Sequence, residues 1–158
     1  DAGADMINSI WGAEYDPELL RVVQEKNIPI VLTQNRMVTH YFQADKVLQE
    51  MITDALQAGI YPWNIIIDPG IGFVEKTEDN FEIIKQIVQL KELGFPILVG
   101  ASRKKLLRTI VGKSANSDIV SGNVALSVVL ARQGAHMIRV HDVEAVVDGL
   151  RISDTLRL

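Results

Sequence analysis

The 158-residue sequence contains no cysteine. This absence excludes disulfide bonds and metal sites built from thiolates, and it fits a reducing compartment such as the cytoplasm. The sequence also has no apolar run of about 18 residues, the length that a membrane-spanning helix needs. No charged segment followed by an apolar segment and a small-residue cleavage site is present, so we expect neither secretion nor a membrane partner.

An excess of positive charge is also missing, because 16 Lys and Arg residues face 20 Asp and Glu residues, for a net charge of −4. This balance gives no support for nucleic acid as a partner, since such proteins neutralise phosphates with cations. One local basic group runs against the average, and it comprises Arg103, Lys104, Lys105 and Arg108. The chain is long enough for one domain with a full hydrophobic core.

Five short apolar segments have the pattern of β-strands. They are continuous runs of Val, Ile and Leu, which is typical of parallel strands buried on both faces. The predicted strands are Asp5–Ile10, Ile28–Thr33, Ile65–Asp68, Ile97–Gly100 and Met137–His141.

Segments with helical apolar spacing separate and follow these strands. Asp16 and Pro17 predict the start of one helix, and Ser102 is expected to cap another. Glycines are expected to end three of the helices, and these glycines are Gly59, Gly94 and Gly112. The last two helices are predicted at residues 118–133 and 142–156.

Strands that alternate with helices imply parallel pairing and right-handed crossovers. A doubly wound sheet and a (β/α)8 barrel both have this order, and both bind ligands beyond the carboxyl ends of the strands. A closed barrel takes eight units in roughly 250 residues. We therefore expect one α/β domain over residues 1–158, of the TIM (β/α)8 barrel type, with about five parallel strands and about three βα units missing before Asp1.

The segment Asp68-Pro69-Gly70-Ile71-Gly72-Phe73 ends a predicted strand with a carboxylate and a tight turn. Such a carboxylate can accept two parallel N–H bonds from an amidine-like edge, as in a pterin or guanine ring. The glycines allow an approach too close for a Cβ atom. The alternative is an ordinary tight turn whose acid caps the following loop.

The segment Gly100-Ala101-Ser102-Arg103-Lys104 ends the next predicted strand and opens a helix. Backbone N–H groups and the helix dipole attract a carboxylate or phosphate there, and Ser102 adds a hydroxyl. Lys104 can place a positive charge over the barrel mouth. The alternative is a capped helix with a solvated basic first turn, although cations at a helix start oppose the dipole and call for a compensating group.

The segment Arg139-Val140-His141-Asp142 closes the last predicted strand, and alternation puts Arg139 and His141 on the same face. A buried Arg needs an anionic partner, and an Arg/His pair suits a phosphate or pyrophosphate. The alternative is an internal salt bridge from Arg139 to Asp68 or another acid of the rim.

Two other histidines and one asparagine call for less specific interpretations. His40 and His136 have no second ligand at metal-binding spacing, so we expect both to be structural or solvated, and we predict no metal ligand in the sequence. For Asn8, at the end of the first predicted strand, the alternative to a functional role is an ordinary turn residue.

Taken together, INSIWG, DPGIGF, LVGASRK and IRVHDV, in this order at the strand ends, resemble dihydropteroate synthase. The resemblance covers essentially the whole sequence, as the C-terminal three-fifths of that enzyme. It implies a transferase of folate biosynthesis, the target of sulfonamides, that condenses p-aminobenzoate with hydroxymethyl-dihydropterin pyrophosphate and releases dihydropteroate and pyrophosphate. It also implies a homodimer in the cytoplasm, and Mg²⁺ whose protein ligand would lie in the missing N-terminal part.

The resemblance implies eight substrate-binding residues at the strand ends. They are Asn8, Asp68 and Lys104 for the pterin, Phe73 and Gly100 for the lining of its slot, Ser102 for the p-aminobenzoate carboxylate, and Arg139 and His141 for the pyrophosphate. The implied mechanism is a loose substitution in which pyrophosphate leaves early and the arylamine captures a cationic pterin methylene. Its four catalytic residues would be Asp68, Lys104, Arg139 and His141.

Two departures from the family pattern stand out. Thr33 and Gln34 occupy positions beside the pterin where the family usually has Met-His, so packing there is altered. The family's magnesium-side Asn, its loop over p-aminobenzoate and a third-strand Asp have no counterpart in this sequence. We therefore expect the isolated chain not to be a competent synthase.

Two alternatives to this function remain. A pterin-dependent methyltransferase resembles the same barrel but needs no pyrophosphate pocket, so Arg139 and His141 argue against it. A non-catalytic half-barrel fragment that associates with a partner is compatible with the same ancestry.

The homodimer has an independent basis in the residues. The stretch Val124–Ala131 is apolar nearly all round the predicted helix at residues 118–133. An outer helix of a barrel needs one apolar stripe, so this pattern predicts a second buried face.

Overall fold

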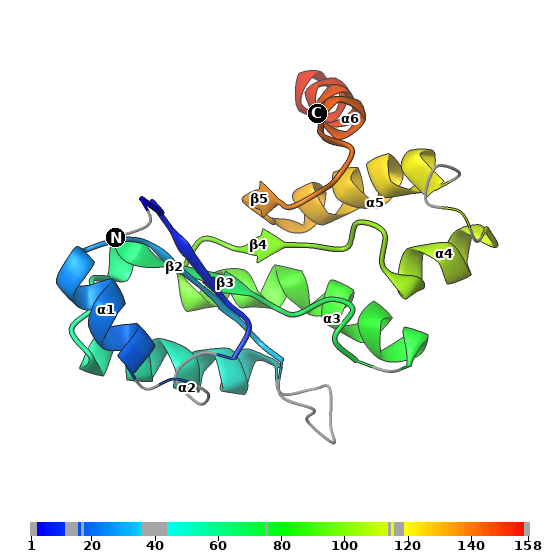
Figure 1. Cartoon of the computed structure of the whole chain (residues 1–158). Helices are drawn as coiled ribbons and strands as arrows, with labels where there is room; N and C mark the ends of the chain where they lie inside the picture. The colour runs from blue at the N-terminus through cyan, green and yellow to red at the C-terminus, as the bar shows by residue number, and fades with distance from the viewer. Residues whose placement is uncertain are drawn as a thin grey trace.

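The computed structural model describes residues 3–11, 16, 18–35, 44–74, 76–113, 115 and 119–156. The strands are β1 (Ile7–Ser9), β2 (Ile30–Thr33), β3 (Ile65–Asp68), β4 (Leu98–Val99) and β5 (Met137–Ile138). The α-helices are α1 (Glu18–Lys26), α2 (Ala44–Gln57), α3 (Thr77–Leu90), α4 (Lys105–Val111), α5 (Val120–Gln133) and α6 (Val143–Thr155), with short 3-10 turns at η2 (Pro62–Asn64) and η3 (Lys91–Leu93). Strands and helices alternate along the chain (Figure 1).

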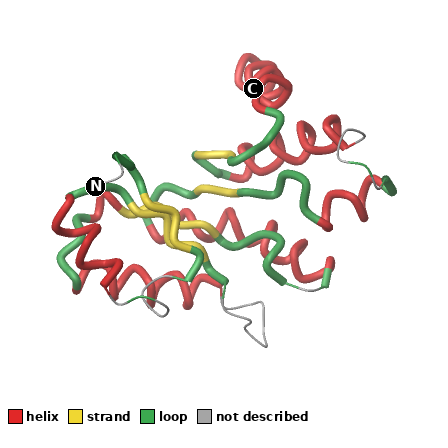
Figure 2. The backbone as a smooth tube through the Cα atoms, viewed as in Figure 1, coloured by secondary structure: helices red, strands yellow, loops and turns green. Residues whose placement is uncertain are grey.

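All strand pairs in the described residues are parallel. β1, β2 and β3 form one sheet and β4 pairs with β5, while a bridge between Ile67 and Ile97 joins the two groups (Figure 2). Spatial neighbours follow the order of the chain, without the reversal of strand order that a doubly wound sheet has. The arrangement is therefore that of consecutive βα units of a barrel, as predicted.

The two faces of the strands bury different residues. Ile30, Ile65 and Ile97 belong to the large core beneath the helices. Val31, Ile66 and Leu98, one position further along each strand, form a separate small cluster with Met137. Because side chains alternate along a strand, the residue two positions after each member of this small cluster lies on the same face of the sheet. Both faces are thus apolar, which explains the continuous Val/Ile/Leu runs.

Several predicted helix boundaries agree with the structure. The Asp16 carboxylate accepts a hydrogen bond from the backbone N–H of Glu18 at 3.0 Å, at the predicted start of α1. Gly112 ends α4 and Gly94 ends η3, both in the left-handed conformation predicted for closing glycines.

The prediction that Ser102 caps a helix is wrong. Helix α4 begins at Lys105, with Lys104 in the cap position, because Arg103 adopts a left-handed turn with φ of 59°. The strand predicted to run to His141 also ends early, at Ile138. Beyond it, the backbone N–H of His141 donates to the Ser102 hydroxyl instead of to a neighbouring strand.

Helix α6 packs against α5, whose all-round apolar pattern had predicted a second buried face. Gly149 of α6 lies so close to Val124 that an added Cβ would come within 2.4 Å of a valine methyl carbon. Much of the all-round apolar pattern is therefore explained within the chain. Val129 of α5 still has 47% of its surface exposed.

None of the helices that the structure describes has the length and apolar character needed to cross a lipid bilayer.

Replacing Ile67 by Ala should lower the free energy of unfolding by about 2–5 kcal/mol, because this side chain in the central strand is fully buried. The matched control is Ile152→Ala on α6, where the side chain is 62% exposed and the expected change is within about 0.5 kcal/mol. Urea denaturation of both variants measures the difference. Equal losses would contradict the assignment of β3 to the centre of the core.

Candidate active site

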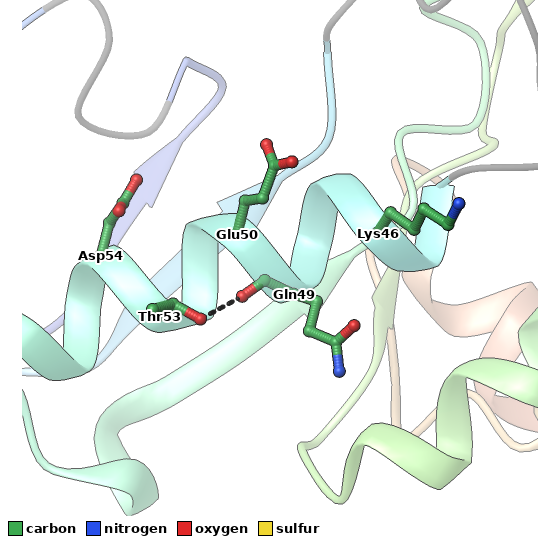
Figure 3. A pocket seen from close by; sticks show the side chains of 5 residues that line it. All are labelled: Lys46, Gln49, Glu50, Thr53 and Asp54. Carbon is green, nitrogen blue, oxygen red and sulfur yellow. Dashed lines mark hydrogen bonds between the residues drawn. The ribbon is translucent and has the colours of Figure 1, made fainter.

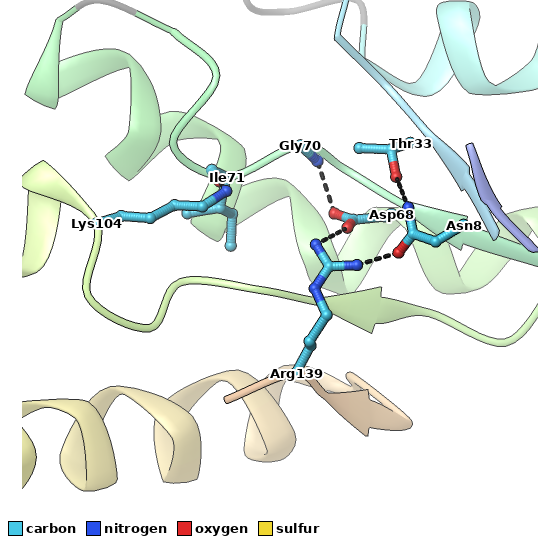
Figure 4. Close-up of polar contacts among 7 residues, drawn as sticks. All are labelled: Asn8, Thr33, Asp68, Gly70, Ile71, Lys104 and Arg139. Carbon is cyan, nitrogen blue, oxygen red and sulfur yellow. Dashed lines mark hydrogen bonds and ion pairs between the residues drawn. The ribbon is translucent and has the colours of Figure 1, made fainter. Parts of the chain in front are cut away.

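The eight residues predicted to bind substrate lie around one rim, at the carboxyl ends of the strands. Asp68 ends β3, and Gly100 and Arg139 directly follow β4 and β5. Figure 4 shows Asn8, Asp68 and Arg139 pointing toward one another, with Lys104 approaching from the side of α4. The loops after β3, β4 and β5 supply the other four residues, which are Phe73, Ser102, Lys104 and His141.

Asp68 has 1% of its surface exposed, and it is held by short-range contacts. One carboxylate oxygen accepts the backbone N–H of Gly70 at 2.9 Å, and the other lies 3.4 Å from Nη2 of Arg139. Burial raises the pKa of the Asp68 carboxyl, while the Gly70 N–H, Arg139, Lys104 and a hydrogen bond from Thr33 act in the opposite direction. The site therefore balances a buried acid against its own set of donors and cations.

The turn after Asp68 has room only for glycine at position 70. Gly70 has φ of 78°, and an added Cβ would lie 1.8 Å from the backbone oxygen of Gln34. The Gln34 N–H in turn donates to the Asp68 carbonyl at 2.9 Å. The turn is thereby seated directly on the end of β2, which fixes the direction of the Asp68 side chain.

Asn80, on α3, supports the same turn from the other side and was not identified from the sequence. Its side-chain oxygen accepts the Gly72 N–H at 2.5 Å, and its amide nitrogen donates to the Lys76 carbonyl at 3.0 Å. The available signal was its spacing, since Asn80 shares a helical stripe with the buried Ile83, Ile84 and Ile87. A buried amide on an apolar stripe indicates a specific partner.

Lys104 lies against the Asp68 loop. Its ammonium group donates to the Ile71 carbonyl and stands 4.4 Å from the centre of the Phe73 ring, a cation–π contact. Burial lowers the pKa of Lys104, the charge of Asp68 opposes this effect, and the charge of Arg139 adds to it. These contacts hold the cation at the rim.

Arg139 connects the first and third strands. Its Nη1 donates to the side-chain oxygen of Asn8, and the Asn8 nitrogen donates to the Thr33 hydroxyl at 3.4 Å. The ion pair between Arg139 and Asp68, one of the two alternatives from the sequence, is present. Since 44% of the Arg139 side chain remains exposed, the same group also faces open space beside the rim.

Ser102 and His141 pair across two loops. The His141 ring nitrogen Nδ1 lies 3.0 Å from the Ser102 hydroxyl. An ion pair of 2.9 Å between Arg103 and Asp142 ties the same loops together, and the Arg108 guanidinium donates to the Arg103 carbonyl at 3.0 Å. Asp142 thus supplies the compensating charge that the basic turn called for, a partner that sequence patterns did not indicate.

A cavity of about 190 Å³ opens between these groups. It is lined by Gly100, Ser102, Lys104, Arg139, Val140 and His141. An added Cβ on Gly100 would come within 2.9 Å of the Arg139 guanidinium, so the glycine leaves room for that side chain. Two cations, a hydroxyl and an imidazole around a small opening suit an anionic group such as a phosphate or carboxylate.

A second hollow, of about 440 Å³, runs along the exposed face of α2 and lacks such chemistry. Figure 3 shows its lining residues spread along a single helix, with the Thr53 hydroxyl bonded to the Gln49 carbonyl of its own helix. Its charges are mixed, because one cation, Lys46, and two carboxylates, Glu50 and Asp54, line it. The rim at the strand ends is therefore the candidate site.

Among the residues that the structure describes, the donor groups do not form a cluster suited to Mg²⁺. No group of three or more His, Asp or Glu residues that could hold a metal ion occurs in the described part of the chain. His136 accepts the backbone N–H of Ile97 at 3.1 Å, which is a structural role. His40 lies outside the described residues.

Comparisons with known proteins agree on one family. Residues 1–141 match the family described as "Pterin binding enzyme". The dihydropteroate synthases of Synechocystis sp. and Bacillus subtilis are 36% and 33% identical to the chain, each over 98% of it. The chain spans a little more than half of the length of these curated relatives, 57% and 55% respectively.

Solved structures give the same result. Dihydropteroate synthase from Xanthomonas albilineans in complex with 7,8-dihydropteroate matches with a TM-score of 0.93 at 34% identity, over 98% of this chain and 60% of that one. The same enzyme with 4-aminobenzoic acid matches with a TM-score of 0.91, over 98% and 58%. The predicted fold class, part of a TIM (β/α)8 barrel, is confirmed.

Replacing Asp68 by Asn should make the fold more resistant to heat at neutral pH. Because burial raises the pKa of Asp68 above its ordinary value of 3.8, the folded protein holds this proton more tightly than the unfolded chain does. The corresponding stabilisation is present below the unfolded pKa and is lost as the pH rises through the folded pKa. The gain in Tm of Asp68→Asn over the unaltered chain should therefore grow from acidic to neutral pH.

Thermal denaturation between pH 4 and pH 8 measures this gain, at roughly unit steps. Asp54→Asn on the exposed face of α2 is the matched control and should show no such trend. A gain for Asp68→Asn that is constant across the range would rule out burial as the cause.

Proposed function

This chain belongs to the pterin binding enzyme family, and from that premise we propose that its strand-end site serves a dihydropteroate synthase. The reaction joins p-aminobenzoate to a hydroxymethyl-dihydropterin pyrophosphate, with loss of pyrophosphate. The observation that carries the proposal is a buried carboxylate, Asp68, directly beside a small cavity lined by Lys104 and Arg139. A substrate with a hydrogen-donating ring edge and an anionic leaving group fits that pair.

Each part of the rim has a role in this proposal. Asp68 and Asn8 accept and donate hydrogen bonds along the pterin edge, and Phe73 and Gly100 border the ring. Lys104 supplies a donor next to Asp68. Arg139 and His141 bind the pyrophosphate, and Ser102 lies beside the carboxylate of p-aminobenzoate.

The proposed chemistry needs electrostatic stabilisation at two ends rather than a covalent nucleophile. Charge builds up on pyrophosphate as its bond to the pterin methylene breaks, and Arg139 and His141 face that charge. The ring becomes cationic at the same time, and the Asp68 carboxylate stabilises it. The arylamine then attacks the methylene and loses a proton.

The magnesium ion implied by the family resemblance remains a proposal for the whole enzyme. The donor set described above does not hold it, so no step is assigned to it. We also propose that the 158 residues alone turn over substrate much more slowly than a form extended to the length of the relatives, and that the protein works in the cytoplasm.

One alternative function has a specific observation against it. A pterin-dependent methyltransferase binds a pterin but no pyrophosphate. That function therefore does not account for the cationic cavity beside Asp68. A non-catalytic half-barrel would also retain the cavity. Catalytic turnover in the extended form separates that alternative from the synthase.

Binding of 7,8-dihydropteroate should depend on Asp68. In Asp68→Asn a donor replaces an acceptor opposite the donor edge of the pterin, so the affinity should fall by about 1.5–3 kcal/mol, which is tenfold or more. Isothermal calorimetry measures the change, and Asp54→Asn on α2 is the control with the same change of charge. Unchanged affinity in Asp68→Asn would refute the assignment, since the same variant is expected to be well folded.

We propose that the chain forms a homodimer through the exposed side of α5. Val129 supports this proposal, because its apolar side chain is 47% exposed and its burial against a second copy would be favourable. Replacing Val129 by Glu should shift the protein toward the monomer in light scattering at tens of micromolar. Val88→Glu on α3, where the side chain is 53% exposed, is the control. A monomer before any substitution would overturn the proposal.

A further inference from the structure

Thr33 ends strand β2 and sits directly opposite Asp68 in the parallel register. Its side chain is fully buried, and it lies on the same face as Val31 two positions earlier, which belongs to the small interior cluster. In Figure 4 its hydroxyl is next to both Asn8 and Asp68. A buried hydroxyl in an otherwise apolar strand indicates specific partners.

The Thr33 hydroxyl lies between Asn8 and Asp68. Its oxygen accepts a hydrogen bond from the Asn8 amide nitrogen at 3.4 Å. The strand register places Thr33 opposite Asp68, and Thr33 is among the groups that lower the pKa of that carboxyl. Because a hydroxyl that accepts from Asn8 keeps its own proton, this proton is available to the Asp68 carboxylate.

These contacts link four side chains. Arg139 donates to the oxygen of Asn8 through Nη1 and lies 3.4 Å from Asp68 through Nη2, while Asn8 donates to the Thr33 hydroxyl. The strand register brings Thr33 and Asp68, the two ends of this series, opposite each other. Arg139 and Thr33 therefore fix which end of the Asn8 amide faces each neighbour.

We propose that Thr33 is a positioning residue of the pterin site, whose hydroxyl holds Asn8 and Asp68 in their ligand-binding orientations. The inference rests on the proposed function and adds a residue that acts through its two neighbours. The positioning role of Thr33 matters most when Arg139 rotates toward an anion in the adjoining cavity. Asp68 then loses one of its two cationic neighbours, and the Thr33 hydroxyl and the Gly70 N–H keep the carboxylate in place.

Two substitutions separate the hydroxyl from the shape of the side chain. Thr33→Val keeps the branched outline and suits a strand, but it has no hydroxyl. Thr33→Ser keeps the hydroxyl and loses a methyl group. Comparing the two with the unaltered chain distinguishes a hydrogen-bonding role from a packing role.

The first measurement needs no ligand. Carbon-detected NMR follows the titration of the Asp68 carboxyl in all three proteins. Thr33→Val should move this titration to higher pH, because a hydrogen bond that favours the charged form is lost. Thr33→Ser should titrate like the unaltered chain. An unshifted titration in Thr33→Val, or equal shifts in both variants, would overturn the inference.

The second measurement is the calorimetric affinity for 7,8-dihydropteroate. Thr33→Val should bind about tenfold more weakly, and Thr33→Ser should stay close to the unaltered affinity. If Asp68→Asn abolishes binding while Thr33→Val leaves it intact, the positioning role is wrong and the proposed function stands. If the unaltered chain does not bind the probe, the proposed function fails for this chain, and the carboxyl titration still decides the role of Thr33.

Discussion

The stabilisation of one buried carboxylate organises the whole carboxyl end of this sheet. An ionised group without partners is costly to bury, so Asp68 requires donors and cations close by. The Gly70 N–H reaches it because the turn folds back at once, and this turn is possible because Gly70 has no Cβ to strike the Gln34 carbonyl. Arg139 approaches the same group from across the sheet. The cations of the rim and its glycines thus answer the same electrostatic requirement.

The interior of the sheet explains why this requirement falls where it does. On β2 and β3, Val31 and Ile66 fill the middle of the face, and the polar Thr33 and Asp68 follow two positions later on the same face. Strand alternation keeps the polar residues on that face. β4 and β5 have the same spacing, because Gly100 follows Leu98 by two positions and Arg139 follows Met137 by two positions.

The sequence was most informative where one physical cause dominates. Continuous apolar runs located the strands, and strand-end polarity pointed to Asp68 and Arg139, because both follow from burial on two faces. It was least informative where a side chain has a choice of partner. Ser102 was expected to cap a helix, yet the left-handed turn at Arg103 turns it to His141. The roles of Asn80, Asp142 and Thr33 depend on contacts between distant segments, which local patterns do not encode.

The partly exposed Arg139 has a consequence for the order of events on the rim. This guanidinium pairs with Asp68 and so occupies the carboxylate that the proposed function assigns to the pterin. Under that proposal, a pterin that carries its own pyrophosphate would draw Arg139 away by offering it a stronger anion, so the two ends of one substrate would assist each other's binding. The proposed product has lost that pyrophosphate. Return of Arg139 to Asp68 would then favour product release, and the site would discriminate substrate from product without moving its backbone.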